Sequence, residues 1–234
     1  MKRTHLKQKG FTLTELMIVV ALAAIFATLA VPNMGGMIAR QRVQGQAAEI
    51  ANAFTFAHNE AVRRGKPVFV VPANIKSDGK LDGAATLNDG WEDAKANALL
   101  VFTDENKTGN TAQKYDSGED LRVVSLNSQI KLVEISQEEL GANVTKKQNK
   151  KMAIAYYSNG QMRIGEFNSG VVTVTEPSGA IGRIMLADKN RKTKNQSSRF
   201  CEVIRLDATG RASLYTDKRS KLTDDKQFFY CKYK

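Results

Sequence analysis

One apolar segment near the start of the chain limits its possible folds more than any other feature. Residues 16–31 are apolar at every position except Thr28, and Glu15 is the one charged residue between Phe11 and Val31. As a helix, residues 11–31 would be about 31 Å long, which matches the ~30 Å hydrocarbon core of a bilayer. We therefore expect residues 11–31 to form a transmembrane helix.

The segment before this helix sets its orientation. Residues 1–10 contain four basic side chains, Lys2, Arg3, Lys7 and Lys9. The positive-inside rule keeps such a segment in the cytoplasm and exports the residues that follow the helix. No small-residue cleavage site follows the apolar run, so any cleavage must come before it. We expect a single-pass protein of the inner membrane, with its C-terminal domain in the periplasm.

Glu15 is the anomaly of the apolar segment. An acidic group at the centre of a membrane helix costs about 2.5–3.5 kcal/mol on insertion scales. One interpretation is that Glu15 lies near the interface and reaches water. The other is that it needs a cationic partner, which a cut after Gly10 would supply as a free amine at Phe11. That amine could belong to the same chain or to a neighbouring subunit.

The run KGFTLTEL at residues 9–16, the apolar helix and Pro32 resemble the class III signal of type IV prepilins and type II secretion pseudopilins. The resemblance covers about the first 65 residues. It implies that a prepilin peptidase cuts between Gly10 and Phe11 and methylates the new amine. It also implies that Glu15 neutralises the amine of an adjacent subunit during assembly. The implied partners are other major and minor pilins and the inner-membrane assembly platform, and residues 1–10 are a leader.

Beyond the apolar segment, the pattern becomes that of an amphipathic helix over residues 32–64. Apolar residues recur every three or four positions and predict one stripe that packs on a sheet: Val43, Ala47, Ile50, Phe54, Ala57 and Ala61. Pro32 removes a helical hydrogen bond and Gly35-Gly36 adds flexibility, which predicts a kink or soft joint. Gly65 and Pro67 predict the end of the helix.

Residues 65–234 have the pattern of a β-rich globular domain. Short runs rich in β-branched and aromatic residues predict strands at 68–71, 99–103, 121–126, 130–135, 152–157, 162–164, 171–175, 183–187, 200–206, 212–215 and 228–233. Asn159-Gly160 predicts a hairpin with a type I′ turn, and residues 73–98 an exposed loop. The predicted fold is α+β and type IV pilin-like, with a long N-terminal helix packed on an antiparallel β-sheet or sandwich.

Four scattered segments of this domain resemble the H branch of minor pilins and pseudopilins, the GspH/FimT-like proteins. They are DGWE at 89–92, LVFTDEN at 100–106, YSNG at 157–160 and IRLDATGR at 204–211. The resemblance implies a minor type IV pilin, a structural subunit of the pilus tip or initiation complex that supports pilus assembly, twitching motility and DNA uptake. Such a subunit moves from the inner membrane to the pilus at the cell surface. The alternative is a minor pseudopilin, H type, of a type II secretion system.

The C-terminal region is strongly basic. Residues 188–234 contain 13 Lys and Arg against six Asp and Glu. An exported basic surface can bind DNA phosphates by counterion release, with Arg205, Arg211 and Arg219 as candidates, which makes a pilus-borne DNA-binding module the alternative of another class. FimT-like pilins that capture DNA carry Gly-Arg-x-Arg at the corresponding hairpin, whereas here Ser213 replaces the second arginine. The other interpretation is that these charges confer solubility or meet acidic neighbouring subunits.

The remaining residues argue for a structural protein without a cofactor. Cys201 and Cys231 lie in the exported part, where oxidation is permitted, so we expect them to pair. Closing that loop should stabilise the fold by roughly 3–4 kcal/mol. Two histidines and two cysteines are too few for a His-rich metal site or a Cys-x-x-Cys zinc site. Residues 104–109 resemble the start of a calcium loop, but Tyr115 stands where the bidentate Glu is needed. We expect no metal, no cofactor and no enzymatic activity.

Overall fold

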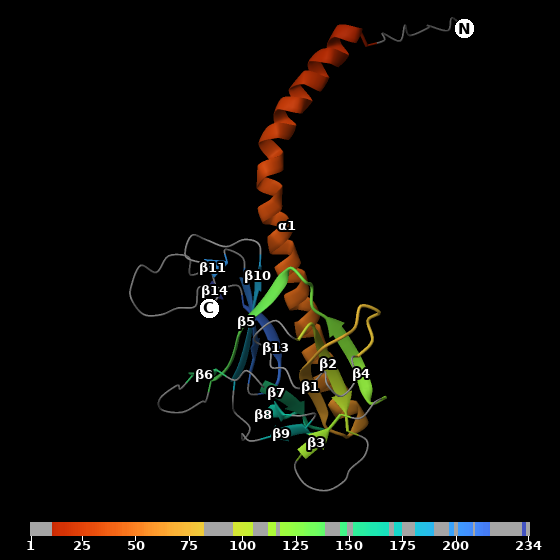
Figure 1. Cartoon of the computed structure of the whole chain (residues 1–234), viewed down its shortest axis with the longest axis vertical. Helices are drawn as coiled ribbons and strands as arrows, with labels where there is room; N and C mark the ends of the chain where they lie inside the picture. Colours follow the sequence, from red (N-terminus) through yellow and green to blue (C-terminus); the bar gives the residue numbers. More distant parts are fainter. Residues whose placement is uncertain are drawn as a thin grey trace, which may run out of the picture. The chain divides into compact units, whose positions relative to one another are not determined.

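The computed structural model describes residues 11–81, 96–104, 112–115, 118–138, 146–148, 152–168, 171–174, 181–189, 197–198, 201–207, 209–215 and 231–232. These residues form one long helix and a set of antiparallel strands, which confirms the α+β class (Figure 1). The chain divides into two compact units, Met1–Ile38 and Ala39–Lys234.

Helix α1 spans Leu13–Arg64 and belongs to both units. It remains helical through Pro32 and Gly35-Gly36, where we expected a kink or joint. It ends as predicted, because Gly65 adopts a φ of 67° and donates its N–H to the Ala61 carbonyl. We expected a membrane span over residues 11–31, whereas no helix in the described residues is both long and apolar enough to cross a membrane.

The strands form three antiparallel sheets. The seven-stranded sheet has the order β3-β9-β8-β7-β1-β2-β4 and the five-stranded sheet the order β13-β12-β10-β5-β6, while β11 pairs with β14. The seven strands are β1 (Val68–Ala73), β2 (Ala98–Thr103), β3 (Ala112–Lys114), β4 (Asp120–Ser125), β7 (Met152–Tyr156), β8 (Met162–Asn168) and β9 (Val171–Val174). The others are β5 (Ile130–Glu138), β6 (Lys146–Gln148), β10 (Ile181–Asp188), β11 (Ser197–Ser198), β12 (Cys201–Leu206), β13 (Ala212–Tyr215) and β14 (Cys231–Lys232).

Three of these strands, β3, β6 and β11, do not appear in the sequence prediction. The first and last are only a few residues long and contain no aromatic residue. Strand β6 begins with Lys146 and Lys147. It is the last strand of the five-stranded sheet, and lysine is common on edge strands because its charge discourages pairing with another chain.

The main hydrophobic core lies between α1 and both larger sheets. The predicted stripe from Val43 to Ala61 is buried, with each of its six side chains at most 1% exposed. It packs with residues of the seven-stranded sheet, including Val70 and Leu99, and of the five-stranded sheet, including Ile184 and Ile204. The second half of α1 is therefore held by both sheets at once.

A second core covers the opposite face of the seven-stranded sheet. Phe69 and Phe102, on neighbouring strands, have ring centroids 5.2 Å apart, and both side chains are fully buried. Every residue of β1 and β2 is buried, so these strands lack the exposed face of a simple helix-on-sheet arrangement.

The predicted hairpin between β7 and β8 is present, but its turn lies one residue earlier than we expected. The N–H of Gly160 bonds to the carbonyl of Tyr157, which makes Ser158 and Asn159 the central residues. Gly160 follows them with a φ of 77°. This is the geometry of a three-residue connection, in which the glycine supplies the left-handed conformation, and not of a two-residue type I′ turn.

Candidate functional site

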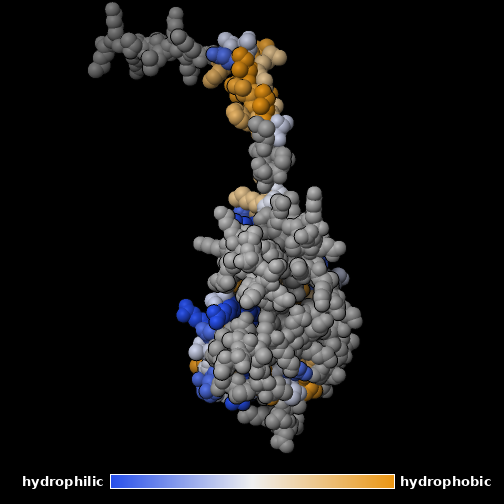
Figure 2. All heavy atoms as spheres, turned by 90° about the vertical axis from the view of Figure 1, so that its left-hand side faces the viewer, coloured by the Kyte–Doolittle hydropathy of each residue, from blue (hydrophilic) through white to orange (hydrophobic). Residues whose placement is uncertain are grey.

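The first unit exposes an unusual number of large apolar side chains. They are Phe11, Leu13, Leu16, Met17, Ile18, Val19, Val20, Leu22, Ile25, Phe26, Met34, Met37 and Ile38. Figure 2 shows these hydrophobic residues gathered along the N-terminal part of α1. A large exposed apolar surface of this kind marks a site that a membrane or another protein covers.

Glu15 has a partner within its own chain. Its Oε2 accepts hydrogen bonds from the Thr12 backbone N–H at 2.9 Å and from the Thr12 hydroxyl at 3.0 Å. In return, the Glu15 backbone N–H donates a hydrogen bond to the Thr12 hydroxyl oxygen at 3.2 Å. This is a capping box at the start of α1. The Thr-x-x-Glu spacing was visible in the sequence, and our prediction missed it.

Other predicted residues of this region are only partly described. Gly10 and the rest of the leader lie outside the described residues, and Phe11 is 89% exposed directly after them. Pro32 lies in α1, and its side chain is outside what the structure describes. The cleavage site and the part that Pro32 takes in assembly therefore stay predictions.

In the second unit, polar side chains anchor α1 to both larger sheets. Arg42 donates to Asp188 on β10 at 3.0 Å, and the side chain of Asp188 is 1% exposed. Gln44 donates to Glu202 on β12, also at 3.0 Å. Gln46 accepts a hydrogen bond from the N–H of Asn127 at 2.8 Å, in the segment after β4. These three contacts lie at the N-terminal end of the buried stripe, which begins at Val43.

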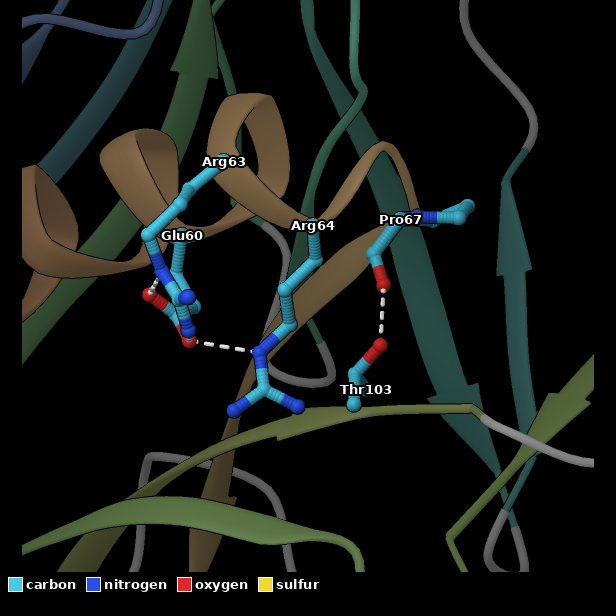
Figure 3. Close-up of polar contacts among 5 residues, drawn as sticks. All are labelled: Glu60, Arg63, Arg64, Pro67 and Thr103. Atoms are coloured by element: carbon cyan, nitrogen blue, oxygen red, sulfur yellow. Dashed lines mark hydrogen bonds and ion pairs between the residues drawn. The ribbon is translucent and has the colours of Figure 1, made fainter.

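The last turn of α1 carries a charged cluster, shown in Figure 3. Glu60 accepts hydrogen bonds from Arg63, whose Nε lies 2.8 Å from its Oε2, and from Arg64. These bonds lower the pKa of Glu60 from its ordinary 4.5 to about 2, with the larger effect from Arg63. Nearby, the buried Thr103 hydroxyl donates to the Pro67 carbonyl at 3.0 Å, which attaches the turn after the helix to β2.

Two turns that the sequence identified separately, YSNG and DATGR, meet beside α1. In each, a glycine N–H bonds to the residue three positions earlier: Gly160 to Tyr157 and Gly210 to Asp207. Both glycines have positive φ, 77° and 81°. His58 of α1 lies against the first turn, with its Nε2 at 3.2 Å from the Gly160 carbonyl. Since a carbonyl oxygen only accepts, this bond requires a proton on Nε2.

Tyr156 joins the two turns and the two larger sheets. Its hydroxyl donates to the Gly210 carbonyl at 3.0 Å, and its ring meets the His58 ring edge-on at 5.5 Å. Burial, together with the charge of Asp207, raises the pKa of Tyr156, so the hydroxyl stays a neutral donor. A Cβ at position 210 would lie 2.5 Å from the Tyr156 ring, so only glycine fits there.

Asp207 organises the second turn. Burial alone would raise its pKa, but hydrogen bonds from the Thr209 hydroxyl and from the backbone N–H groups of Arg211 and Thr209 outweigh that effect. The pKa of Asp207 is therefore lowered. Its Oδ1 accepts all three bonds, at distances from 2.7 to 3.0 Å. The exposed side chain of Arg211 projects from this hydrogen-bonded turn.

The predicted DNA-binding arginines are only partly described. Arg205 and Arg211 are exposed, whereas Arg219 lies outside the described residues. Arg205 on β12 is directly opposite Arg183 on β10 and Ser213 on β13. The structure thus places Arg183 next to Arg205. The sequence did not identify Arg183 as a candidate, because the pairing register of two strands cannot be read from sequence spacing.

Both cysteines of the chain belong to the second unit. Cys201 is disulfide-bonded, and the sequence contains one other cysteine, Cys231, which pairs through β14 with Ser198 of β11. The side chain of Cys231 lies outside what the structure describes, so the Cys201–Cys231 pairing stays a prediction. Across the described residues, no group of three or more His, Cys, Asp or Glu side chains is placed to hold a metal ion.

Comparison with known proteins finds relatives that are similar in sequence over part of the chain and solved structures that are similar over most of it. Two curated proteins from Pseudomonas aeruginosa, each named fimbrial protein, are 43% identical over 61 residues, which is 26% of this chain and 39% of theirs. The match thus spans well under half of those relatives. Among solved structures, the chain is similar to the type IV minor pilin FimU of Pseudomonas aeruginosa, at 14% identity and a TM-score of 0.38, covering 76% of this chain and 90% of that one. It is also similar to the minor pseudopilin EPSH from the type II secretion system of Vibrio cholerae, at 12% identity and a TM-score of 0.37, covering 78% and 99%.

Two family models match this sequence. Residues 5–31 match the prokaryotic N-terminal methylation motif, and residues 46–189, more than half of the chain, match the type II transport protein GspH. The first match indicates a pilin that is anchored in a membrane through its N-terminal helix. Both imply prepilin processing and contacts with other pilins. The chain therefore belongs to the GspH family of minor pilins and pseudopilins, which are structural proteins.

Proposed function

We propose that this chain is a minor type IV pilin, a structural subunit of the pilus tip or initiation complex. The observation that carries the proposal is the exposure of the large apolar side chains of α1 from Leu13 to Phe26, and of Met34, Met37 and Ile38. The inner membrane would cover this surface before assembly, with the second unit in the periplasm, and the helices of neighbouring subunits would cover it in the pilus. The inner-membrane assembly platform would move the subunit between these two environments.

Processing would prepare the N-terminus for this role. We infer that the prepilin peptidase cuts between Gly10 and Phe11 and that the new Phe11 amine is methylated. In the described residues, Thr12 bonds only to Oε2 of Glu15, and no hydrogen bond to Oε1 is present. Because a carboxylate has about four lone-pair sites, the amine of a neighbouring subunit can bind Oε1 while the capping box remains intact.

The Glu15→Gln variant tests this proposal. The amide keeps an oxygen that can accept the cap but removes the negative charge that a neighbouring amine needs. We expect the variant to reach the membrane at the normal level and to be several-fold depleted from sheared pili. Glu49→Gln, which changes an exposed carboxylate in the second half of α1, is the control. Normal incorporation of Glu15→Gln would contradict the proposal.

The cleavage site has a separate test. Replacing Gly10 by a larger residue should block the peptidase, because a residue without a side chain lets a protease approach the backbone. The expected result is an uncut precursor, seen as a heavier band on a gel. A mature chain that still begins at Met1 in the unmodified protein would refute the processing scheme.

The name of the matched family favours one alternative, a minor pseudopilin of a type II secretion system. The two systems share the processed helix and differ in what the filament does. Deleting the gene and measuring both piliation and secreted enzymes separates them. Loss of piliation with normal secretion supports the minor pilin, and the opposite result supports the pseudopilin.

The opposed Arg183 and Arg205 favour DNA binding as a candidate of another class. Neighbouring guanidinium groups can contact successive phosphates, and such binding weakens steeply as salt rises. A gel shift of the full chain in detergent, with a salt titration, tests this function. It requires binding at low salt that falls when Arg205, Arg211 and Arg219 are changed to Gln. No binding at low salt would eliminate it.

A further inference from the structure

Helix α1 and the two glycine turns enclose a pocket of about 340 Å³ in the second unit. It is lined by Thr55 and His58 of α1, Gly160 of the β7–β8 turn, and Thr209, Gly210 and Arg211 of the β12–β13 turn. This volume lies at the lower end of the ~300–1,000 Å³ typical of sites for small ligands. None of these residues belongs to the exposed apolar segment that the proposed function uses.

The glycine turns define the walls of the pocket. A Cβ at Gly160 would lie 3.6 Å from His58 Nε2 and would narrow the space beside the ring. At Gly210, the hydrogen bond from the Tyr156 hydroxyl and the close approach of the Tyr156 ring fix the position of the second turn. The pocket is therefore part of the packed structure of two sheets and a helix, and it does not depend on one loop alone.

Most donors in the pocket are already used. The Thr55 hydroxyl donates to a carbonyl of its own helix at 3.1 Å, and the Thr209 hydroxyl donates to Asp207 at 2.7 Å. His58 donates its Nε2–H to Gly160. What these side chains still offer a ligand is lone pairs, on two hydroxyl oxygens and, in the neutral ring, on Nδ1.

Arg211, in contrast to these acceptors, offers a positive charge and hydrogen-bond donors. Its side chain is exposed, and its guanidinium makes no hydrogen bond or ion pair with the residues that the structure describes. Asp207, in the same turn, accepts three hydrogen bonds at its Oδ1, and the charge of Arg211 helps to lower its pKa. A ligand thus meets one available cation next to several acceptors.

We propose that this pocket binds an acidic side chain, Asp or Glu, together with an adjacent peptide N–H, on a segment of a neighbouring pilin subunit. The carboxylate pairs with the guanidinium of Arg211, which suits a bidentate contact. The peptide N–H groups donate to the free lone pairs of Thr55, Thr209 and His58. A phosphodiester fits less well, because it has acceptors only and would face these lone pairs without donors. The inference rests on the proposed function, since the filament supplies the neighbour.

The test uses a peptide probe and the full chain in detergent. The chain has two histidines, so a His5→Gln background leaves His58 as the single imidazole signal in NMR spectra. We expect N-acetyl-Gly-Asp-Gly-amide to shift the His58 signal saturably and the matching Asn peptide to have little effect. Arg211→Gln should weaken the Asp peptide about tenfold, as expected for the loss of one charge-assisted contact. Arg211→Lys should recover part of the binding.

Arg163→Gln is the matched control, because Arg163 is an exposed arginine of β8 whose guanidinium lies over Tyr157, outside the pocket lining. Binding that is absent, equal for the Asp and Asn peptides, or unchanged by Arg211→Gln overturns the proposal. Stronger binding of oligothymidylate than of the Asp peptide also overturns it and assigns the pocket to nucleic acid. Incorporation of Glu15→Gln into pili is measured separately, so either proposal can fail without the other.

Discussion

The two halves of helix α1 are both rich in apolar residues, yet they have opposite environments. In the first half, Leu13 and Phe26 are 77% and 68% exposed, whereas Ile50 and Phe54 in the second half are fully buried. The first half is apolar on all sides, and the second carries an apolar stripe with polar residues between. A stripe can be buried by the chain's own sheets, but an all-apolar surface needs a covering from outside the chain.

The largest expected effect comes from comparing one phenylalanine in each half. Phe54→Ala leaves a cavity between α1 and the sheets and should reduce the free energy of unfolding by about 3–5 kcal/mol. Phe26→Ala should change the free energy of unfolding by less than about 0.5 kcal/mol, because the Phe26 side chain is mostly exposed in the isolated subunit. Chemical denaturation of both variants in detergent measures the difference. Similar losses would mean that the halves are not distinct in the isolated subunit.

The second prediction compares two arginines of α1 that are two positions apart. Arg42→Gln removes a charged partner of the buried Asp188 and should destabilise the protein by about 2 kcal/mol, less than for a fully buried pair because Arg42 is 29% exposed. Arg40→Gln, at an exposed position, should have almost no effect. The same denaturation assay measures both. Equal effects would show that the contact with β10 does not anchor the helix.

The smallest expected effect concerns acid stability at the end of the buried half. Because folding lowers the pKa of Glu60 from 4.5 to about 2, its ion pairs stabilise the fold above about pH 4.5. That contribution is lost as the pH falls toward 2. Glu60→Gln should therefore cost about 1 kcal/mol at neutral pH, since Arg63 is well exposed, and nothing near pH 2.

Unfolding curves from pH 7 to pH 2 test this dependence, with Glu49→Gln as the control. Glu49 is exposed, receives a hydrogen bond from Gln46 and forms no ion pair with the residues that the structure describes. The free energy of unfolding of Glu49→Gln should change with pH in the same way as that of the unmodified protein. A constant difference between Glu60→Gln and the unmodified protein at all pH values would exclude the ion pairs as the source of the stability.

Local patterns predicted the parts of the structure that depend on residues close in the sequence. The spacing from Val43 to Ala61 predicted the buried stripe, and Gly65 predicted the end of α1. The Thr12-x-x-Glu15 capping box was equally local, and it was missed because Glu15 was considered only for its charge in an apolar segment. The turn near Gly160 was placed one residue late, because an Asn-Gly pair suits two turn types.

The candidate pocket could not be predicted in this way. Nothing in the sequence around His58 shows that it meets the turn at Gly160. The encounter of Gly160 with Gly210 depends on the pairing of β7 with β8 and of β12 with β13, and on how the two sheets pack around Tyr156.

The sequence by itself determined the long helix, its division into an all-apolar and a striped half, and the antiparallel strands that follow. These features rest on periodicity and turn chemistry, which act over a few residues. Only the tertiary structure decided which strands are buried on both faces, which acidic residue meets Arg42, and which side chains line the pocket. Those outcomes depend on the register and packing of segments that are distant in the sequence, 146 residues apart for Arg42 and Asp188, and no local pattern encodes them.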